Sequence, residues 1–239
     1  MSGERVIKCF IGLFDILGYK NIVNRENIME IFRVHNFLLN ETEDSFRHID
    51  GVYTIGRGPG PHDKRITVHS YSDTIVFYST DISNEPTREV DRVFLETLVA
   101  CEFLYMAANA SKLPLRGAIT VGNLIDHKNI LVSKEMVEAY EMEKKQDWIG
   151  CWINSRCFEH ISKDAFIENV AAKSIIEYDI PIKKGIHERG YVYNWARNYV
   201  LEECPFLKNM EADLDRDDIK IKYDNTAKFI KYIKDSIVN

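Results

Sequence analysis

Two aspartates lie inside apolar, strand-like segments of this chain of 239 residues. Asp15 lies in the run from Cys9 to Tyr19, and Asp73 lies in the run from Ile66 to Tyr78. Burying a carboxylate costs free energy unless a cation or a hydrogen-bond donor meets it. Two such carboxylates suggest a shared hard divalent cation, Mg²⁺ or Mn²⁺, bound through oxygen. Metal pairs held in this way usually carry out phosphate chemistry.

The segment after Asp15 has features that suit a phosphate. Gly18 allows close backbone approach, and the amides of a turn that leads into a helix could hold phosphate oxygens, helped by the helix N-terminus. The alternative is that Asp15 caps a helix that begins near Lys20, but the aspartate lies too early in the chain for that. We therefore interpret Asp15 as a candidate metal ligand at the end of a strand.

Asp73 is predicted to lie at the tip of a β-hairpin, where Ser72-Asp73 joins two strands. A Ser-Asp turn is common, so the pair of aspartates points to a metal more strongly than Asp73 alone. Arg116 begins a strand that should lie beside this hairpin, although a surface salt bridge would equally explain it. His69 should point to the opposite face from Ser70, and the alternative is a histidine satisfied in the core.

Other motifs are excluded or carry little information. The glycines of the predicted loop at 56–61 are not followed by Gly-Lys-Ser/Thr, so they do not form a Walker loop, and neither a nucleophile elbow nor an HExxH zinc motif occurs. The five cysteines have no CxxC or zinc-type spacing. An odd number of scattered cysteines indicates reduced thiols in a cytosolic protein.

The composition is that of a globular protein, with 45% hydrophobic and 28% charged residues. We expect a single domain over residues 1–239 with no clear linker. The net charge of -6 argues against a nucleic-acid polymer as the main partner. No segment is expected to supply the about 20 apolar residues that cross a bilayer, and Asp15 interrupts the N-terminal apolar stretch too early for a signal peptide. We therefore expect a cytoplasmic protein without a membrane partner.

Hydrophobic periodicity predicts an alternation of strands and helices, in an α+β fold with helices on one face of a sheet. In the helices we expect the apolar positions to be buried. In the first helix these include Ile28 and Phe32, with His35 on the same side. In the third they are Met136, Val137, Tyr140 and Met142. The predicted strands are 6–14, 65–72, 74–79, 115–121, 148–153 and 175–182, and the predicted helices are 21–40, 87–111, 133–146 and a last amphipathic helix with Phe229, Ile230, Ile233 and Ile237.

The order of these motifs resembles the catalytic domain of class III nucleotidyl cyclases. The shared pattern is strand-Asp-Ile-x-Gly-aromatic, then a hairpin Asp, then Arg-Gly-Ala-Ile-x-x-Gly. The segments Met136–Glu143 and Gln146–Trp152 look more specifically like the stand-alone bacterial pyrimidine cyclases of Pycsar antiphage defence. The likeness covers about residues 6–155, with a C-terminal elaboration over about 156–239, and it implies an antiparallel or mixed sheet with helices packed on it.

The resemblance implies a homodimeric lyase, with active sites at the dimer interface, that converts UTP into 3′,5′-cyclic UMP and pyrophosphate. Two divalent ions, Mn²⁺ or Mg²⁺, would be held by Asp15, Asp73 and the Ile16 carbonyl, and would activate the ribose 3′-hydroxyl. The alternatives are a cytidylate cyclase, a purine cyclase or an inactive nucleotide-binding module, and retention of two mutually repelling carboxylates argues against the last. The residues implied in substrate binding are Phe14, Leu17, Gly18, Tyr19, His69 and Arg116, the last two as a pair that reads the base across the cleft.

One departure from the family pattern concerns the helix over residues 133–146. Purine cyclases carry an Asn and an Arg where this chain has Val137 and Glu141. Either the cation that stabilises the transition state comes from elsewhere, or the activity is lost. The candidates from the sequence are Lys134, Lys128 and Arg116.

Overall fold

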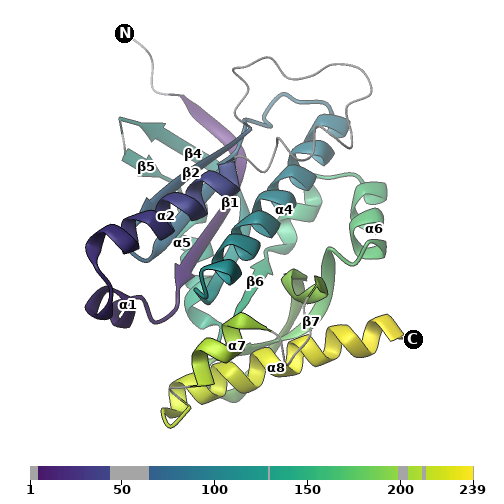
Figure 1. Cartoon of the computed structure of the whole chain (residues 1–239). Coiled ribbons are helices and arrows are strands. Elements are labelled where there is room, and N and C mark those ends of the chain that lie inside the picture. Colours follow the sequence, from purple (N-terminus) through teal and green to yellow (C-terminus); the bar gives the residue numbers. More distant parts are fainter. Residues whose placement is uncertain (1–4, 44–64, 129, 199–203, 212–213, 239) are drawn as a thin grey trace.

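A computed structural model describes residues 5–43, 65–128, 130–198, 204–211 and 214–238. The predicted loop at 56–61 lies outside these residues. The described chain forms one mixed sheet with helices packed on it, as the sequence predicts, and Figure 1 shows the arrangement.

The sheet has the strand order β2-β3-β1-β4-β6-β8-β7, and β5 pairs only with β4. The pair β4–β6 is parallel and the other pairs are antiparallel. The long β1 therefore lies inside the sheet, between β3 and β4, and β2 is an edge strand. The strands are β1 (Val6–Ile16), β2 (Ile66–Tyr71), β3 (Thr74–Ser79), β4 (Leu115–His127), β5 (Ile130–Val132), β6 (Gly150–Ile153), β7 (Ile175–Ile182) and β8 (Ile186–Tyr193).

Helices connect these strands and extend the chain beyond them. The α-helices are α1 (Tyr19–Arg25), α2 (Ile28–Glu43), α4 (Thr87–Ala110), α5 (Lys134–Lys145), α6 (Lys163–Ala171), α7 (Pro205–Met210) and α8 (Asp217–Val238). Short 3₁₀ helices are η1 (Ser155–Glu159), η2 (Lys183–Gly185) and η3 (Trp195–Asn198).

Helices cover both faces of the sheet, and the expectation of helices on one face is wrong. Phe10 of β1 packs against Phe94 of α4, with ring centroids 5.1 Å apart, so α4 covers the face to which even-numbered β1 residues point. On the opposite face, α5 packs against β4 and β1. A side chain at Gly122 of β4 would overlap Glu135 of α5, so this glycine permits the close approach of the helix.

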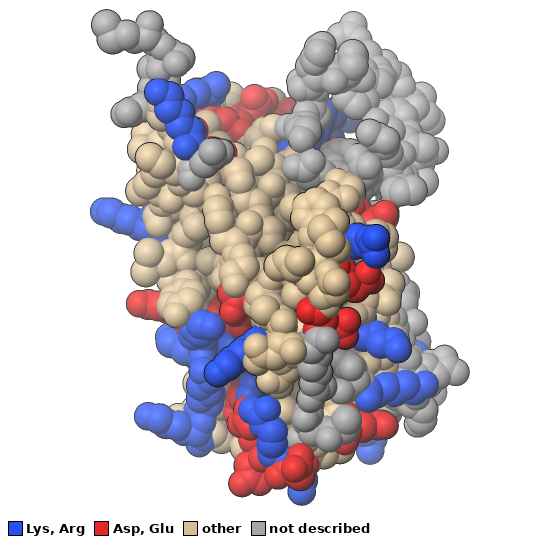
Figure 2. All heavy atoms as spheres, turned by 60° about the vertical axis from the view of Figure 1, so that its left-hand side comes forward, with Lys and Arg blue, Asp and Glu red and all other residues tan. Residues whose placement is uncertain are grey.

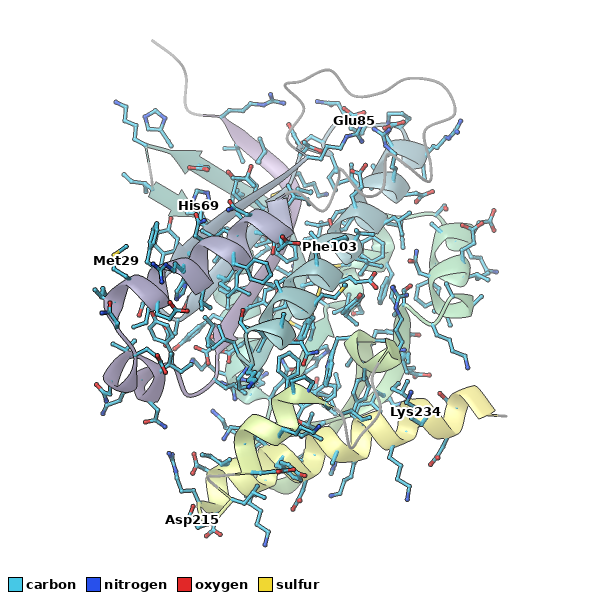
Figure 3. The ribbon with its side chains drawn as sticks, viewed as in Figure 1. Met29, His69, Glu85, Phe103, Asp215 and Lys234 are labelled. Carbon is cyan, nitrogen blue, oxygen red and sulfur yellow. The ribbon has the colours of Figure 1, made fainter. Side chains whose placement is uncertain are left out.

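The helix predicted over 21–40 is two helices, because Asn27 breaks it. The Asn27 side chain accepts a hydrogen bond from the Met29 amide at 2.8 Å, and its carbonyl accepts bonds from the first turn of α2. The apolar pattern continues through this break, but Ile28 is 73% exposed and Phe32 is 60% exposed. Met29 projects outward at the start of α2 (Figure 3). The expectation that Ile28 and Phe32 are buried is therefore wrong.

Helix α5 buries only part of the apolar set expected from the sequence: Met142 is buried as predicted and Met136 is partly buried. Val137 and Tyr140 are exposed, whereas Ala139, Met142 and the charged Glu143 are buried. The physical reason is an ion pair, because Glu143 meets Arg116 on β4 below the helix.

The C-terminal segment joins the same sheet and core. β7 and β8 form an antiparallel hairpin that extends the sheet past β6, and α8 runs along one end of the molecule in Figure 1. Phe229 of α8 packs edge-on against Trp148 at 4.7 Å. Ile230 and Ile233 are buried as the sequence predicts, and the side chain of Ile237 lies outside the described residues.

Helix α4 corrects the expectation that no segment could span a bilayer. Among the described residues, α4 is the one helix whose length and composition would allow it to cross a membrane. However, 67% of its apolar window is buried inside the protein. Burial of that kind is typical of a core helix.

All five cysteines are free and buried, in agreement with the prediction of reduced thiols. Burial raises the pKa of the Cys9 thiol to about 12. A buried thiol with a raised pKa is a poor nucleophile, so the cysteines serve packing.

Candidate functional site

The structure brings positions 15 and 73 together at one end of the sheet. Asp15 pairs with Thr74, the residue that follows Asp73. The Ile16 amide donates a hydrogen bond of 2.8 Å to the Asp73 carbonyl. Ser72 supports the tight turn between β2 and β3 with a φ of 59°. The two aspartates are therefore neighbours across β1 and the hairpin tip, although they are far apart in the sequence.

Two cations surround the Asp15 carboxylate, whose side chain is 14% exposed. The Arg116 guanidinium lies 3.6 Å from one carboxylate oxygen, and the Lys144 ammonium lies 3.7 Å from the other. These positive charges compensate a carboxylate that is otherwise costly to bury. A metal ion that binds Asp15 must therefore compete with them.

Arg116 is a buried residue, and the alternative of a surface salt bridge is wrong. Its Nε donates to Glu143 at 2.5 Å, and its Nη1 donates to the Gln146 carbonyl at 2.9 Å. The Gln146 side chain in turn donates to the Gly117 carbonyl at 2.8 Å. Arg116 thus ties the start of β4 and the end of α5 to the Asp15 carboxylate.

Glu143 completes a cluster of two acids and two bases with Asp15, Arg116 and Lys144. Its side chain is fully buried, and Lys144 lies 3.6 Å from its second oxygen. Burial raises the pKa of Glu143, while the nearby Arg116 opposes that rise. The sequence analysis missed Glu143 and Lys144; the available signal was the helical spacing of Glu143, four residues after the buried Ala139.

The turn after Asp15 has fewer available groups than the sequence analysis expected. The Phe14 side chain is buried on the opposite face of the sheet, where it stacks on Phe77 at 5.4 Å, so only its backbone could meet a ligand. The Leu17 amide is already bonded to the Pro114 carbonyl at 2.8 Å. Gly18 adopts a left-handed conformation with a φ of 76° and precedes α1 without a side-chain cap. This leaves the Gly18–Tyr19 part of the turn as the candidate phosphate contact.

His69 lies on the same sheet face as Asp15 but has different partners. Its Nε2 is 3.3 Å from an Asp126 oxygen, and its ring stacks near Tyr71 and Tyr78. Tyr78 donates a hydrogen bond to Asp126, and burial and then this bond raise the Tyr78 pKa. The sequence analysis missed Asp126, which carries the signal that identified the other aspartates, a carboxylate inside an apolar strand run.

His69 and Arg116 do not meet within one chain. His69 is on β2 and Arg116 is on β4, and the strands β3 and β1 lie between them. The remaining candidate cations are also distant, because Lys128 follows the far end of the thirteen-residue β4 and Lys134 begins α5, whereas Lys144 lies at its end. In the described part of the chain, Arg116 and Lys144 are the cations that pair with Asp15.

The donor atoms at this end of the sheet fit a hard divalent cation. Two carboxylates and nearby backbone carbonyls are oxygen ligands, which Mg²⁺ prefers together with water and substrate phosphate. Within the described ranges no group of three or more His, Cys, Asp or Glu side chains is placed to hold a metal ion. The site would therefore depend on substrate oxygens to complete the coordination.

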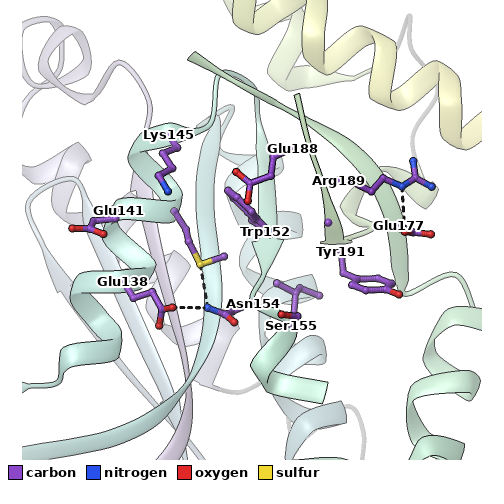
Figure 4. A pocket seen from close by; sticks show the side chains of 13 residues that line it. Glu138, Glu141, Lys145, Trp152, Asn154, Ser155, Glu177, Glu188, Arg189 and Tyr191 are labelled. Atoms are coloured by element: carbon purple, nitrogen blue, oxygen red, sulfur yellow. Dashed lines mark hydrogen bonds and ion pairs between the residues drawn. The ribbon is translucent and has the colours of Figure 1, made fainter. Parts of the chain in front are cut away.

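Two cavities flank α5. An open groove of about 510 Å³, the lysine groove, has four lysines and two glutamates in its lining: Lys144, Lys145, Lys183, Lys184, Glu141 and Glu188. It adjoins Asp15 through Lys144. A second cavity of about 420 Å³ lies between α5 and the strands β6 and β8 (Figure 4). The aspartates line neither of these cavities. The lysine groove is the one whose charge suits a polyphosphate.

The chain has the class III nucleotidyl cyclase fold. The adenylyl cyclase CyaB from P. aeruginosa has a similar structure, with a TM-score of 0.51 and 12% sequence identity over 80% of this chain and 95% of that chain. The catalytic core of a rhodopsin-guanylyl cyclase with converted specificity, in complex with ATPalphaS, gives a TM-score of 0.51 and 15% identity over 80% of this chain and 98% of that chain. No protein-family model and no curated protein matches the sequence.

Proposed function

We propose that this protein is a uridylate cyclase that converts UTP into 3′,5′-cyclic UMP and pyrophosphate, with CTP as the alternative substrate. The observation that carries the proposal is the position of Asp15 beside the hairpin tip that bears Asp73, in a fold shared with adenylyl and guanylyl cyclases. A fold alone does not define an activity, and the paired carboxylates supply the chemical argument.

Asp15, Asp73 and the Ile16 carbonyl would hold two divalent cations, Mn²⁺ or Mg²⁺. When bound, such ions would lower the pKa of the ribose 3′-hydroxyl and would neutralise part of the negative charge of the triphosphate. Arg116 and Glu143 would orient Asp15. Arg116 is buried and pairs with the carboxylates of both Asp15 and Glu143. The remaining requirement is alignment of the 3′-oxygen with the α-phosphorus, which positioning by the protein provides.

Lys144 is our candidate for a cation that meets the phosphates. It is 41% exposed, lies beside Asp15 and lines the lysine groove. Lys183 of η2 lines the same groove. Burial and then the charge of Arg116 lower its pKa. These lysines could supply the positive charge that is missing from the positions of Val137 and Glu141.

His69 and Asp126 together offer hydrogen bonds that suit a pyrimidine edge. Uracil can accept at O4 and donate from N3, so His69 would donate and Asp126 would accept. Cytosine can present an acceptor at N3 and a donor at N4, which is why CTP stays as the alternative. UTP is preferred in the proposal because the resemblance favours the uridylate activity. We assign Arg116 to Asp15 and Glu143 rather than to the base.

We also propose a single-domain, cytoplasmic homodimer that acts in antiphage defence. The defence role rests on the resemblance to Pycsar cyclases. The dimer is supported by exposed apolar side chains on several elements, and Figure 2 shows a largely uncharged area on the side of the molecule where Figure 1 has α2 and β5. An area of that kind suits a protein interface. Exposed examples are Ile28, Phe32, Ile130, Val132 and Val137.

The test is to incubate the purified protein with Mn²⁺ and each of the four nucleoside triphosphates and to identify products by mass. The proposal expects cyclic UMP, and cyclic CMP would establish the alternative. Asp15→Asn and Asp73→Asn should each lower turnover at least about 100-fold, since each removes a charged metal ligand. Asp179→Asn, at an exposed aspartate of β7, is the matched control and should keep full activity.

Cyclic AMP or cyclic GMP as the main product would replace the pyrimidine assignment with a purine cyclase. Absence of any cyclic product, with the protein folded, would leave a nucleotide-binding module. Full turnover by either Asn variant would remove that aspartate from the metal site.

A further inference from the structure

His35 joins the two segments that carry the paired aspartates. Its Nδ1 lies 2.8 Å from the Ser70 hydroxyl on β2, and its Nε2 lies 3.1 Å from the Tyr19 hydroxyl at the start of α1. Ser70 is three residues before Asp73, and Tyr19 is four residues after Asp15. One side chain of α2 therefore bridges the strand before one aspartate and the turn after the other.

The bridge is well ordered by its surroundings. The His35 ring packs edge-on against Tyr19, with centroids 5.5 Å apart and an angle of 89°. Both ring nitrogens are within hydrogen-bond distance of a hydroxyl, so the ring orientation is fixed from two sides. Burial lowers the pKa of His35, which favours the neutral ring near pH 7.

The segments that His35 joins need such a restraint. β2 is an edge strand of the sheet, and among the strands that the structure describes only β3 pairs with it. Gly18 precedes Tyr19 in a left-handed turn. The Tyr19 pKa is raised by burial and then by the charge of Asp73, so the phenol lies within electrostatic reach of that carboxylate. A shift of either segment would change the separation of Asp15 and Asp73.

We propose that His35 is a positioning residue for the metal site, locking the turn after Asp15 to the strand before Asp73 so that both carboxylates can share one pair of divalent cations. This inference rests on the proposed function, because it concerns the same site. It assigns His35 no contact with substrate or metal. Groups that hydrogen-bond directly to a metal ligand change metal affinity by about 10- to 100-fold when they are replaced. His35 acts through Tyr19 and Ser70, so we expect the lower end of that range.

The test compares Mn²⁺ binding by wild type and His35→Phe in the presence of 3′-deoxy-UTP, which has no 3′-hydroxyl and cannot cyclise. Free Mn²⁺ is followed by electron paramagnetic resonance. Phenylalanine keeps the flat ring against Tyr19 and removes both hydrogen bonds, so we expect about 10-fold weaker Mn²⁺ binding. Turnover of UTP by the variant should recover at high Mn²⁺, whereas a general loss of folded protein would lower turnover at every concentration.

Two further variants separate positioning from stability. Val34→Ala shortens a partly buried neighbour on α2 and should lower the melting temperature without changing Mn²⁺ affinity. Ser70→Ala removes one of the two bonds from the β2 side, and it should weaken Mn²⁺ binding about 3-fold or more even if His35→Phe fails to fold. The double variant that combines His35→Phe with Ser70→Ala should lose less Mn²⁺ binding free energy than the sum of the two single losses. The reason is that each substitution removes the same hydrogen bond between His35 and Ser70.

Equal Mn²⁺ affinity in wild type, His35→Phe and Ser70→Ala would overturn the inference and leave the proposed function standing. If His35→Phe does not fold, unchanged affinity in Ser70→Ala would overturn it. A wild-type protein that binds no Mn²⁺ beside 3′-deoxy-UTP would overturn both.

Discussion

At the scale of single residues, Lys144 occupies the position with the clearest consequence for chemistry. It contacts Asp15 and Glu143 and is still partly exposed, so it can turn toward a phosphate when a metal ion takes its place at Asp15. Lys144→Met should therefore lower kcat/KM for the nucleotide by about 10-fold or more, as expected for the loss of one phosphate-facing cation. Steady-state kinetics at saturating Mn²⁺ measure this effect.

The control for this prediction is Lys220→Met, at an exposed lysine of α8. It removes the same charge from the molecule and should leave kcat/KM unchanged. If Lys144→Met and Lys220→Met turn over the nucleotide equally well, other cations contact the phosphates. Lys183 and Lys184 of the lysine groove would then be the next candidates.

Residue identities were predictable from sequence where the chemistry is local. Asp15 and Asp73 are recognisable because each is a charge within an apolar strand run. The contacts of Arg116 were not predictable, because they depend on which residue of α5 faces β4. His35 was noticed as part of a helix face, but its partners Ser70 and Tyr19 come from two other elements. Such pairings depend on the tertiary arrangement and leave no spacing pattern in the chain.

At the scale of elements, β4 carries two glycines with different physical reasons. A methyl group at Gly117 would lie 2.2 Å from the Phe14 ring and 2.7 Å from the Leu13 carbonyl oxygen, which the backbone holds in place. A methyl group at Gly122 would meet atoms of the flexible Glu135 side chain. Gly117→Ala should therefore destabilise the protein by about 1–3 kcal/mol, and Gly122→Ala by clearly less.

Urea unfolding of the two variants, beside wild type, measures this difference. The comparison is matched because both changes add one methyl group to the same strand. If Gly122→Ala loses more unfolding free energy than Gly117→Ala, the Glu135 side chain of α5 cannot move aside to accommodate the added methyl group. That result would also make the α5 side of the sheet the more tightly packed one.

Elements were predicted well where one signal dominates. The alternation in β2 and β3 gave their bounds and the turn at Ser72-Asp73 closely. The break at Asn27 was missed because apolar residues continue across it, and only the capping contacts of Asn27 reveal it. The exposure of Val137 and Tyr140 on α5 was missed because a buried ion pair, Arg116–Glu143, outweighs the burial of their side chains.

At the scale of the whole molecule, the motif order was enough to predict a cyclase-like α+β sheet, and the similar solved structures agree with it. The placement of helices on both faces was not predictable from that order, since strand periodicity does not say which face a helix covers. The separation of His69 from Arg116 by two strands also follows only from the strand order. That separation bears directly on how an active site could be completed.

If the active site forms between two copies, as we propose, His69 of one chain would serve the aspartates of its partner. Coexpression of Asp15→Asn with His69→Ala would then yield heterodimers with one intact site and one site that carries both changes. Random pairing makes half of the dimers mixed, so cyclic UMP formation at low UTP should recover to about a quarter of the wild-type rate.

The matched control is coexpression of Asp15→Asn with Asp73→Asn. Both changes then fall on metal sites built within single chains, so no pairing restores an intact site and the mixture should stay inactive. Recovery in the first mixture alone would establish a composite site. A first mixture no more active than its two parents would instead place His69 and the aspartates of one chain in the same site, because neither protomer could then repair the other.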